Sequence, residues 1–506
     1  MSVHRIMGIE TEYGILSPHN PNISPEILSA QVVNAYAELV FPGRQRPFRW
    51  DYNVESPFND LRYAESLQHP DERELWSNFD LGIPNLMLTN GARLYVDHAH
   101  PEYSTPEVTN PRDAALWDLA GEVIMRDAAQ KASELSGNLI VLYKNNTDGK
   151  GASYGTHENY QVLRSVPFEN LVKHLTSFFV TRNIWAGSGR VGIGQGSEQA
   201  GFQISQRADF FEARVGIETT INRPIINTRD EPHADAQRYR RLHVIVGDAN
   251  LSPAMTFLKM GATSLILSMI EADFLDDVFD LADPVREITA VSRDYSMGHL
   301  ITLADGQQLS ALAIQRHFYE RAVQFVALTD PDEQTLEVLT LWESVLSALE
   351  VDQMSLAGTV DWVTKLQLLE SFRERDGLDW SSSKLQAIDL QFCDIRPEKG
   401  LARIFRPEPG EGDLFTEAEI GFAVHTAPAD TRAFLRGQLV QRFAPALIAA
   451  SWETLIFQAA DNESRIRVSL PDASRLGSEE VSAVLSGNPN LYSLLSQLGQ
   501  LTMVEY

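Results

Sequence analysis

Strand-like and helical patterns are segregated along this chain. Five short runs rich in β-branched and aromatic residues lie in the first half, at 5–16, 92–98, 139–144, 154–163 and 242–247. Helical periodicity runs over 113–135, 168–185, 310–327, 333–351 and 359–375 and dominates the second half. Such segregation favours an antiparallel sheet packed with helices over a doubly wound parallel sheet. The sequence therefore predicts an α+β fold with a mainly antiparallel sheet.

Two segments interrupt these patterns. Residues 41–90 are crowded with Pro, Arg, Asp, Asn and aromatic residues and show no sustained period, which is typical of a long functional or disordered loop. Pro and Gly residues cluster at 407–412, and Thr426-Ala427-Pro428 follows, as in linkers and turns. With 506 residues, the chain exceeds the size at which one core keeps growing. We expect a large domain over 1–425, with 41–90 as an inserted loop, and a small domain over 426–506.

Composition excludes several classes of protein. The formal net charge of −27 argues against nucleic-acid binding, which needs a basic surface. The longest apolar runs, such as 265–270, are far shorter than the roughly 20 residues that span a bilayer, and the N-terminus has no apolar signal core. The single cysteine, Cys393, allows neither an internal disulfide nor a cysteine metal cluster. We expect a cytoplasmic protein that binds neither nucleic acid nor membranes.

The first strand-like run carries two carboxylates, Glu10 and Glu12. A spacing of two residues places both side chains on one face of a strand. Neighbouring carboxylates suit Mg²⁺, which prefers hard oxygen ligands and retains waters that nucleotide phosphates can replace. A solvated strand face gives the same pattern, so this motif alone leaves both interpretations open.

The second strand-like run places Arg93, Tyr95 and Asp97 on one face, with apolar residues alternating on the other. The following turn, HPEY at 100–103, returns another carboxylate, Glu102. A polar face with an apolar back indicates a cleft that holds a ligand. An exposed strand with a salt bridge from Arg93 is the alternative.

Two further runs add histidine and arginine side chains. His157 lies on one face of its strand, and Arg241 and His243 share a face of another. Arg229, in the polar loop 227–233, is suited to clamp a phosphate with two hydrogen bonds. Each histidine is a candidate metal ligand, with a structural role as the alternative. Carboxylates for a metal and guanidinium groups for phosphate are together what metal-assisted phosphoryl or acyl chemistry requires.

One glycine-rich segment is a misleading signal. GSGRVG at 187–192 matches a dinucleotide-binding pattern, but a helix-like stretch precedes it and a strand-like stretch follows it. That order is the reverse of the one in dinucleotide-binding folds. The chain also has no Walker-type phosphate loop, kinase signature or serine nucleophile elbow. Any ATP site must therefore be of another kind.

Six motifs run in order along the chain: MGIETEYG at 7–14, NGARLYVD at 90–97, HPEY at 100–103, KNNTD at 144–148, SYGTHENY at 153–160 and IINTRDEPHAD at 225–235. Together they closely resemble the Pup ligase and depupylase family, whose members act on Pup, a small disordered protein tag of actinobacteria. The resemblance ends around 431–433 and Trp452.

The resemblance implies a fold like the carboxylate-amine ligases, relatives of glutamine synthetase, with ATP held in a curved-sheet cradle. It implies three residues around Mg²⁺: Glu10, Tyr95 and Glu102. It implies three that contact ATP, or ADP plus phosphate: Arg93, Thr105 and Trp452. Asp97 would be the catalytic carboxylate, as nucleophile or as general base.

The family has a ligase branch and a hydrolase branch. The ligase branch lacks most of the stretch 41–90, and its turn after the aspartate is one residue longer than DHAHP at 97–101. The resemblance therefore implies an ATP- and Mg²⁺-dependent depupylase and Pup deamidase, with Pup and pupylated proteins as partners and a functional link to the bacterial proteasome. The stretch 41–90 is expected to gate or tune the site. The alternatives are a Pup–protein ligase, another glutamate-amine ligase, and a catalytically silent Pup-binding adaptor.

Overall fold

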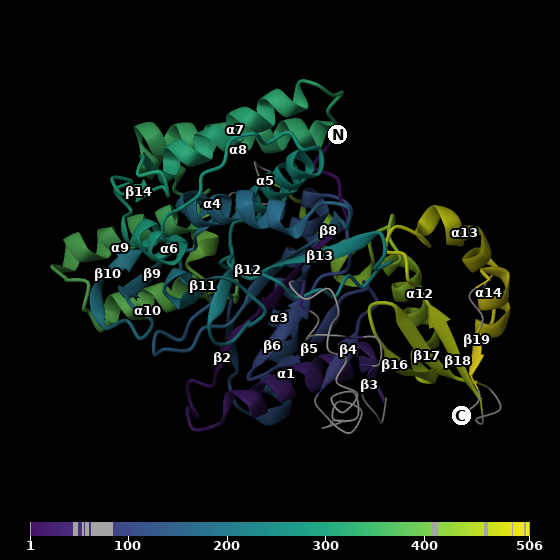
Figure 1. Cartoon of the computed structure of the whole chain (residues 1–506). Coiled ribbons are helices and arrows are strands. Elements are labelled where there is room, and N and C mark those ends of the chain that lie inside the picture. Colours follow the sequence, from purple (N-terminus) through teal and green to yellow (C-terminus); the bar gives the residue numbers. More distant parts are fainter. Residues whose placement is uncertain are drawn as a thin grey trace.

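The computed structural model describes residues 2–43, 49–52, 55, 60–61, 84–406, 413–459, 464–487, 489–499 and 502–504. A six-stranded sheet with antiparallel pairing lies at its centre (Figure 1). The strands across this sheet are β13 (Tyr239–Val244), β8 (Thr156–Leu163), β1 (Met7–Glu12), β6 (His100–Ser104), β5 (Arg93–Asp97) and β4 (Asn85–Met87). The predicted α+β class with a mainly antiparallel sheet is confirmed.

Helices cover one face of the central sheet. Helix α1 (Pro25–Val40) contacts β5 and β6, α3 (Pro111–Ser136) contacts β1, and α5 (Pro253–Glu271) contacts β8. Along β8 every second side chain, from Thr156 to Val162, is buried on this side, and the side chains between them are only partly buried. The period of two thus separates a buried face under the helices from a partly buried polar face on the other side.

Local capping fixes where the two longer of these helices begin. Asn110 accepts a hydrogen bond from the Asp113 backbone N–H at the start of α3, and Ser252 accepts one from Met255 at the start of α5. Both helices have a proline in their first turn, where the missing N–H costs nothing. By length and apolar composition α5 could cross a membrane. However, 89% of its apolar 18-residue segment is buried inside the protein, as in a core helix.

The predicted helices are confirmed to within a few residues. The remaining helices of this part are α4 (Phe168–Ala186), α6 (Pro284–Arg293), α7 (Ala311–Val326), α8 (Glu333–Val351), α9 (Asp361–Asp376), α10 (Ser383–Phe392) and α11 (Glu417–His425). Fully buried tryptophans, Trp185, Trp342 and Trp362, pack among them. Strand β9 (Arg190–Ile193) follows α4, so the segment 187–192 has the helix-then-strand order expected from the sequence.

Four two-stranded sheets complete the larger part of the chain. They pair β9 with β10 (Gln199–Gln203), β11 (Phe211–Gly216) with β12 (Arg223–Asn227), β14 (Leu300–Thr302) with β15 (Gln308–Ser310), and β2 (Gly14–Leu16) with β7 (Val141–Tyr143). The pair of β2 and β7 continues directly from β1, because only Tyr13 separates β1 from β2.

A second sheet lies in the C-terminal part of the chain, drawn in yellow at one side of Figure 1. Its strands, in spatial order, are β19 (Thr502–Val504), β18 (Arg465–Ser469), β17 (Thr454–Gln458), β16 (Leu447–Ala450) and β3 (Arg49–Trp50). It is accompanied by α12 (Ala433–Phe443), α13 (Ser478–Ser486) and α14 (Leu491–Gln497). The second sheet is therefore completed by a strand from the N-terminal part of the chain.

The stretch 41–90 contains two short strands that its sequence does not predict, β3 and β4. Each pairs at the edge of a sheet, β3 with β16 and β4 with β5. Edge pairing uses backbone groups and needs no periodic side-chain pattern. The sequence pattern therefore does not predict these strands. Most of the stretch, including 62–83, lies outside the described residues.

Candidate functional site

The polar side chains predicted on separate strands share one face of the central sheet. Glu10 on β1 lies opposite His157 on β8, and Glu12 on β1 lies opposite Glu102 on β6. Glu102 in turn lies opposite Tyr95 on β5. Directly opposed residues of antiparallel strands point to the same side. The register of four strands thus brings these groups together on the face that the helices leave open.

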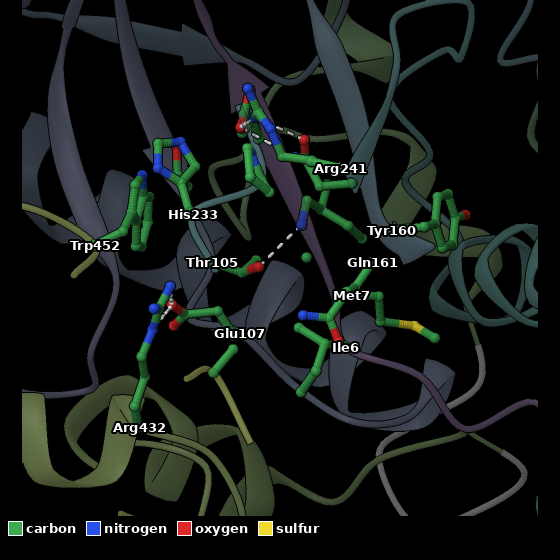
Figure 2. A pocket seen from close by; sticks show the side chains of 17 residues that line it. Ile6, Met7, Thr105, Glu107, Tyr160, Gln161, His233, Arg241, Arg432 and Trp452 are labelled. Carbon is green, nitrogen blue, oxygen red and sulfur yellow. Dashed lines mark hydrogen bonds and ion pairs between the residues drawn. The ribbon is translucent and has the colours of Figure 1, made fainter. Parts of the chain in front are cut away.

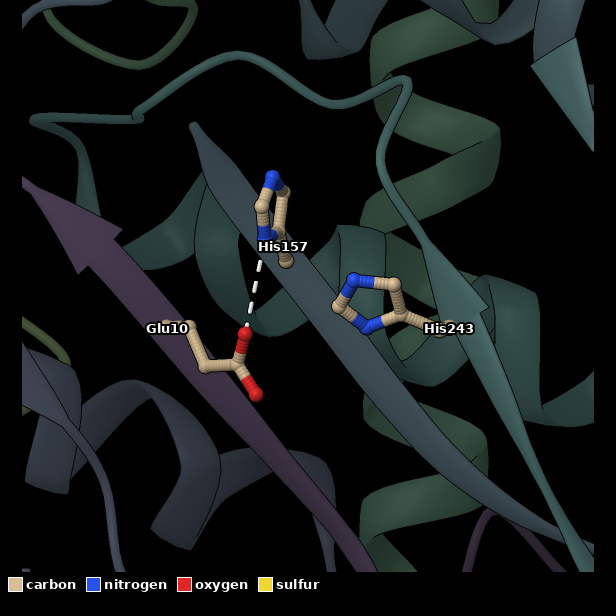
Figure 3. A group of neighbouring side chains, drawn as sticks. All are labelled: Glu10, His157 and His243. Carbon is tan, nitrogen blue, oxygen red and sulfur yellow. Dashed lines mark hydrogen bonds and ion pairs between the residues drawn. The ribbon is translucent and has the colours of Figure 1, made fainter. Parts of the chain in front are cut away.

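One cluster on this face combines Glu10 with His157 and His243 (Figure 3). The ligand atoms of the three lie within 4.8 Å of one another. Glu10 Oε2 is 3.4 Å from His157 Nδ1, and Arg241 Nη1 is 3.4 Å from Glu10 Oε1. His243 Nδ1 is 3.0 Å from the Asn159 side-chain oxygen, which orients its ring.

The charges of this cluster are set by burial and by neighbouring groups. Burial would raise the pKa of Glu10, but the His157 hydrogen bond and the nearby His243 and Arg241 lower it well below its usual range. Burial, reinforced by the Arg241 charge, lowers the pKa of His243 well below its usual value. An ionised carboxylate beside a neutral imidazole is a suitable pair of ligands for a divalent cation.

A second cluster is formed by three carboxylates: Glu12, Asp97 and Glu102, whose ligand atoms lie within 4.8 Å of one another. The Gly155 backbone N–H donates to Glu12 Oε1 at 2.7 Å. Burial raises the pKa of Glu102 well above its usual value, and the charges of Asp97 and Glu10 add to this effect. Burial likewise raises the pKa of Tyr95, so its phenol keeps its proton beside Glu102. Carboxylates held this close fit a hard divalent cation, which would relieve their repulsion.

Asp97 lies at the exposed end of this cluster, where β5 turns into β6. Its side chain is 38% exposed, and its Oδ2 is 3.1 Å from His98 Nδ1. Burial would raise the pKa of Asp97, but the hydrogen bond from His98 and the charge of His98 lower it. The same hydrogen bond raises the pKa of His98 to about 8. Asp97 is therefore an ionised carboxylate within reach of a ligand from solvent.

A cavity that is partly open to solvent adjoins the first cluster (Figure 2). Its lining includes four of the predicted site residues: Glu10, Thr105, Arg241 and Trp452. The Thr105 Oγ1 atom accepts a hydrogen bond of 3.0 Å from the Ile9 backbone N–H, which fixes the side chain at the sheet. This cavity reaches from the carboxylate–histidine cluster to an aromatic ring, as a nucleotide site would.

The other two predicted basic residues lie beside these clusters. Arg93 is buried between the rings of Trp50 and Tyr95, with its Cζ atom 3.6 Å and 3.7 Å from the two ring centroids. Arg229 follows β12. Its positive charge helps to lower the pKa of His243, although burial and the charge of Arg241 have larger effects. Among the described residues, the buried Arg229 Nε atom has no hydrogen-bond partner, and Arg229 does not line the cavity.

Several residues of this region were not predicted as site residues. His233, Arg432 and Glu107 line the cavity; Figure 2 shows His233 on the same side as Trp452, and Arg432 paired with Glu107. His233 has a φ of 47°, a strained backbone conformation often stored at functional sites. Neither this strain nor the long-range ion pair leaves a pattern in the local sequence.

Comparison with curated proteins gives relatives over nearly the full chain. The chain is 52% identical over 470 residues to a "Depupylase" of Acidothermus cellulolyticus, covering 92% of this chain and 93% of that protein. It is 46% identical over 497 residues to a "Pup deamidase/depupylase" of Mycolicibacterium smegmatis, covering 98% and 100%. A "Pup--protein ligase" of M. smegmatis is 43% identical over 363 residues, covering 70% and 80%.

Two solved structures share the architecture. The complex between Prokaryotic Ubiquitin-like Protein Pup and its ligase PafA matches with a TM-score of 0.78 at 32% identity, covering 98% of this chain and 95% of that one. The Pup ligase PafA in complex with ADP matches with a TM-score of 0.72 at 34% identity, covering 86% and 96%. The model of the family described as Pup-ligase protein matches residues 5–456. This chain belongs to the Pup-ligase protein family.

Proposed function

We propose that this protein is a depupylase and Pup deamidase that needs ATP, or ADP plus phosphate, and Mg²⁺. It would hydrolyse the isopeptide bond between the side chain of the C-terminal glutamate of Pup and a substrate lysine, and convert a C-terminal glutamine of Pup to glutamate. The observation that carries this proposal is the convergence of Glu12, Asp97 and Glu102. The relatives named as depupylases support it, because they match over nearly the whole chain at higher identity than the named ligases.

The nucleotide and the metal would be held on the open face of the sheet. Three predicted residues are proposed to surround Mg²⁺, namely Glu10, Tyr95 and Glu102; Glu12, His157 and His243 lie near enough to support them. Five are proposed to contact the nucleotide or a phosphate: Arg93, Thr105, Arg229, Arg241 and Trp452. A bound Mg²⁺ supplies charge neutralisation and polarisation of oxygen atoms.

Asp97 is proposed to act on the amide. Its ionised side chain at the end of β5 either attacks the amide carbon or removes a proton from the water that attacks it. In both routes the carbon–nitrogen bond breaks, water supplies the new oxygen, and the lysine amine or ammonia leaves after gaining a proton. Trapping Pup on Asp97 with a reactive C-terminal analogue would support the covalent route. If no such adduct forms under turnover conditions, Asp97 acts as the general base.

Product analysis separates the hydrolase from the alternatives. With glutamine-ending Pup, the hydrolase releases ammonia without stoichiometric ATP consumption. A ligase instead joins glutamate-ending Pup to a lysine-bearing target and consumes ATP. A silent adaptor binds Pup and turns over neither substrate. Net conjugation, or no turnover of a fluorogenic Pup amide, would overturn the proposed hydrolase.

The cellular setting and the domain division are also proposed. A cytoplasmic location is consistent with the single cysteine, Cys393, which is buried and whose pKa burial raises to about 11. A functional link to the bacterial proteasome rests on the Pup tag alone. A division near residue 426 is consistent with the second sheet, in which all strands except β3 follow that point.

A further inference from the structure

Strand β3 (Arg49–Trp50), within the 41–90 stretch, is fixed to the C-terminal sheet. Strand β3 pairs in parallel with β16, Trp50 lying opposite Ala450. The next residue, Asp51, is buried; its carboxylate accepts a hydrogen bond of 2.9 Å from Thr454 Oγ1 and lies 3.4 Å from Arg467. The Asp51 backbone N–H also donates to the Ala450 carbonyl at 2.8 Å. This anchoring determines where the Trp50 side chain lies.

Trp50 reaches from that sheet to two residues proposed to bind the nucleotide. Its indole lies against the guanidinium of Arg93, whose Cζ atom is 3.6 Å from the ring centroid. The same indole meets Trp452 edge to face, with centroids 5.8 Å apart and an interplanar angle of 77°. Trp50 is only 7% exposed. One buried aromatic side chain therefore contacts both an arginine of the central sheet and a tryptophan of the cavity wall.

The packing around Arg93 leaves its guanidinium a restricted set of directions. Trp50 covers one face, and Tyr95, 3.7 Å away, is a second stacking partner. The Nε–H donates to the Asn85 side-chain oxygen at 3.1 Å. A stacked guanidinium can bind further groups only through the N–H bonds in its own plane. Arg93 is thereby held in one orientation before any ligand arrives, which lowers the entropic cost of binding.

We propose that Trp50 is a positioning residue of the nucleotide site, acting through Arg93 and Trp452. The proposal rests on the proposed nucleotide-dependent function, and adds that strand β3 links this site to the C-terminal sheet. Trp50 itself takes no part in bond breaking. Its loss should therefore weaken nucleotide binding and leave the chemical step intact once the site is saturated.

The test compares Trp50→Leu and Trp50→Phe with the wild-type enzyme, using ADP with Mg²⁺ in isothermal titration calorimetry. Because indole stacks on cations better than a phenyl ring, the Kd for ADP should rise about threefold in Trp50→Phe and about tenfold in Trp50→Leu. The KM for ATP in isopeptide cleavage should rise in parallel, with kcat at saturating ATP within about twofold of wild type. A merely structural role would lower kcat and leave KM unchanged.

A control and a double variant sharpen the result. Trp380 also stacks on an arginine, Arg373, at 4.4 Å, but lies among α9 and α10; Trp380→Leu should leave the Kd for ADP unchanged. If Trp50 acts through Arg93, adding Trp50→Phe to Arg93→Lys should weaken binding less than Trp50→Phe does alone. A Kd for ADP equal to wild type in Trp50→Phe overturns the proposal, even if Trp50→Leu fails to fold.

The outcomes also separate this inference from the proposed function. If the wild-type protein binds ADP but cleaves no Pup conjugate, the proposed hydrolase function is wrong. The Kd for ADP of the Trp50 variants still tests the role of Trp50. If the wild-type protein cleaves conjugates and Trp50→Leu binds ADP as tightly as wild type, only the role proposed for Trp50 is wrong.

Discussion

Glu10 on β1 lies directly opposite His157 on β8, and the Glu10 Oε2 atom is 3.4 Å from His157 Nδ1. The pair marks the place where two strands far apart in sequence combine their polar faces. Beside it, His243 from β13 contributes a neutral ring and Glu102 from β6 a carboxylate.

Replacing Asp97 by asparagine should abolish most amide cleavage while nucleotide binding persists. The amide cannot serve as a nucleophile or base, so kcat should fall by about 10²- to 10⁴-fold. Cleavage of a fluorogenic Pup amide measures kcat, and calorimetry with ADP measures binding. Asp305→Asn, in the exposed turn between β14 and β15, is the control. Substantial turnover by Asp97→Asn would remove Asp97 from the proposed role.

Replacing Glu102 by glutamine should raise stability without Mg²⁺ and reduce the further stabilisation that Mg²⁺ and ADP provide. Without the ion, the substitution removes a buried carboxyl that is costly to ionise beside Asp97 and Glu10, so stability at pH 7 should rise. With Mg²⁺ and ADP, the variant should gain less stability than wild type, because a ligand is lost. Thermal unfolding in both conditions measures this. Equal stabilisation of both proteins by Mg²⁺ and ADP would argue against a metal at Glu102, and Glu134→Gln on the exposed end of α3 should change neither value.

Replacing Gly155 by alanine should disturb the carboxylate cluster without unfolding the protein. A Cβ atom there would lie 2.8 Å from Glu12 Oε1 and would also collide with the His157 ring. Displaced ligands should lower kcat by about 10²-fold. Gly421→Ala on α11, where a Cβ meets nothing within 4 Å, is the matched control. A kcat of Gly155→Ala equal to that of wild type would show that the added Cβ atom does not displace Glu12 or His157.

Glu107 should make stability depend on acidity. Burial would raise its pKa, but Arg436 and Arg432 hold the pKa at about 2, below the ordinary 4.5. A lowered folded pKa stabilises the protein above pH 4.5, and this stabilisation is lost as pH falls towards 2. Glu107→Gln should cost about 3 to 5 kcal/mol at pH 7, because it leaves two buried guanidinium groups without their counter-charge.

Urea unfolding of wild type and Glu107→Gln from pH 7 downwards checks this dependence. The difference in unfolding free energy should shrink below pH 4.5. Glu480→Gln removes a carboxylate paired with Arg475 in an exposed ion pair, and should cost at most about 1 kcal/mol. A difference for Glu107 that stays constant with pH would contradict the assigned pKa.

Local pattern in the sequence determined much of this protein. Alternation along single strands gave the shared faces of Glu10 with Glu12 and of Arg93 with Asp97, because side chains two apart on a strand point the same way. Helical periodicity gave α3, α4, α7, α8 and α9. Helix α5 was not among the predicted helices, since it is buried on nearly every side and shows no polar face from which to recognise a period.

Only the tertiary structure decided which faces meet. The register that sets Glu10 against His157 depends on backbone hydrogen bonds between strands about 150 residues apart, and no local pattern encodes it. The same holds for Trp50, which reaches Arg93 because β3 pairs with β16, nearly four hundred residues later. The sequence determined the chemistry that each strand carries, and long-range pairing assembled that chemistry into one site.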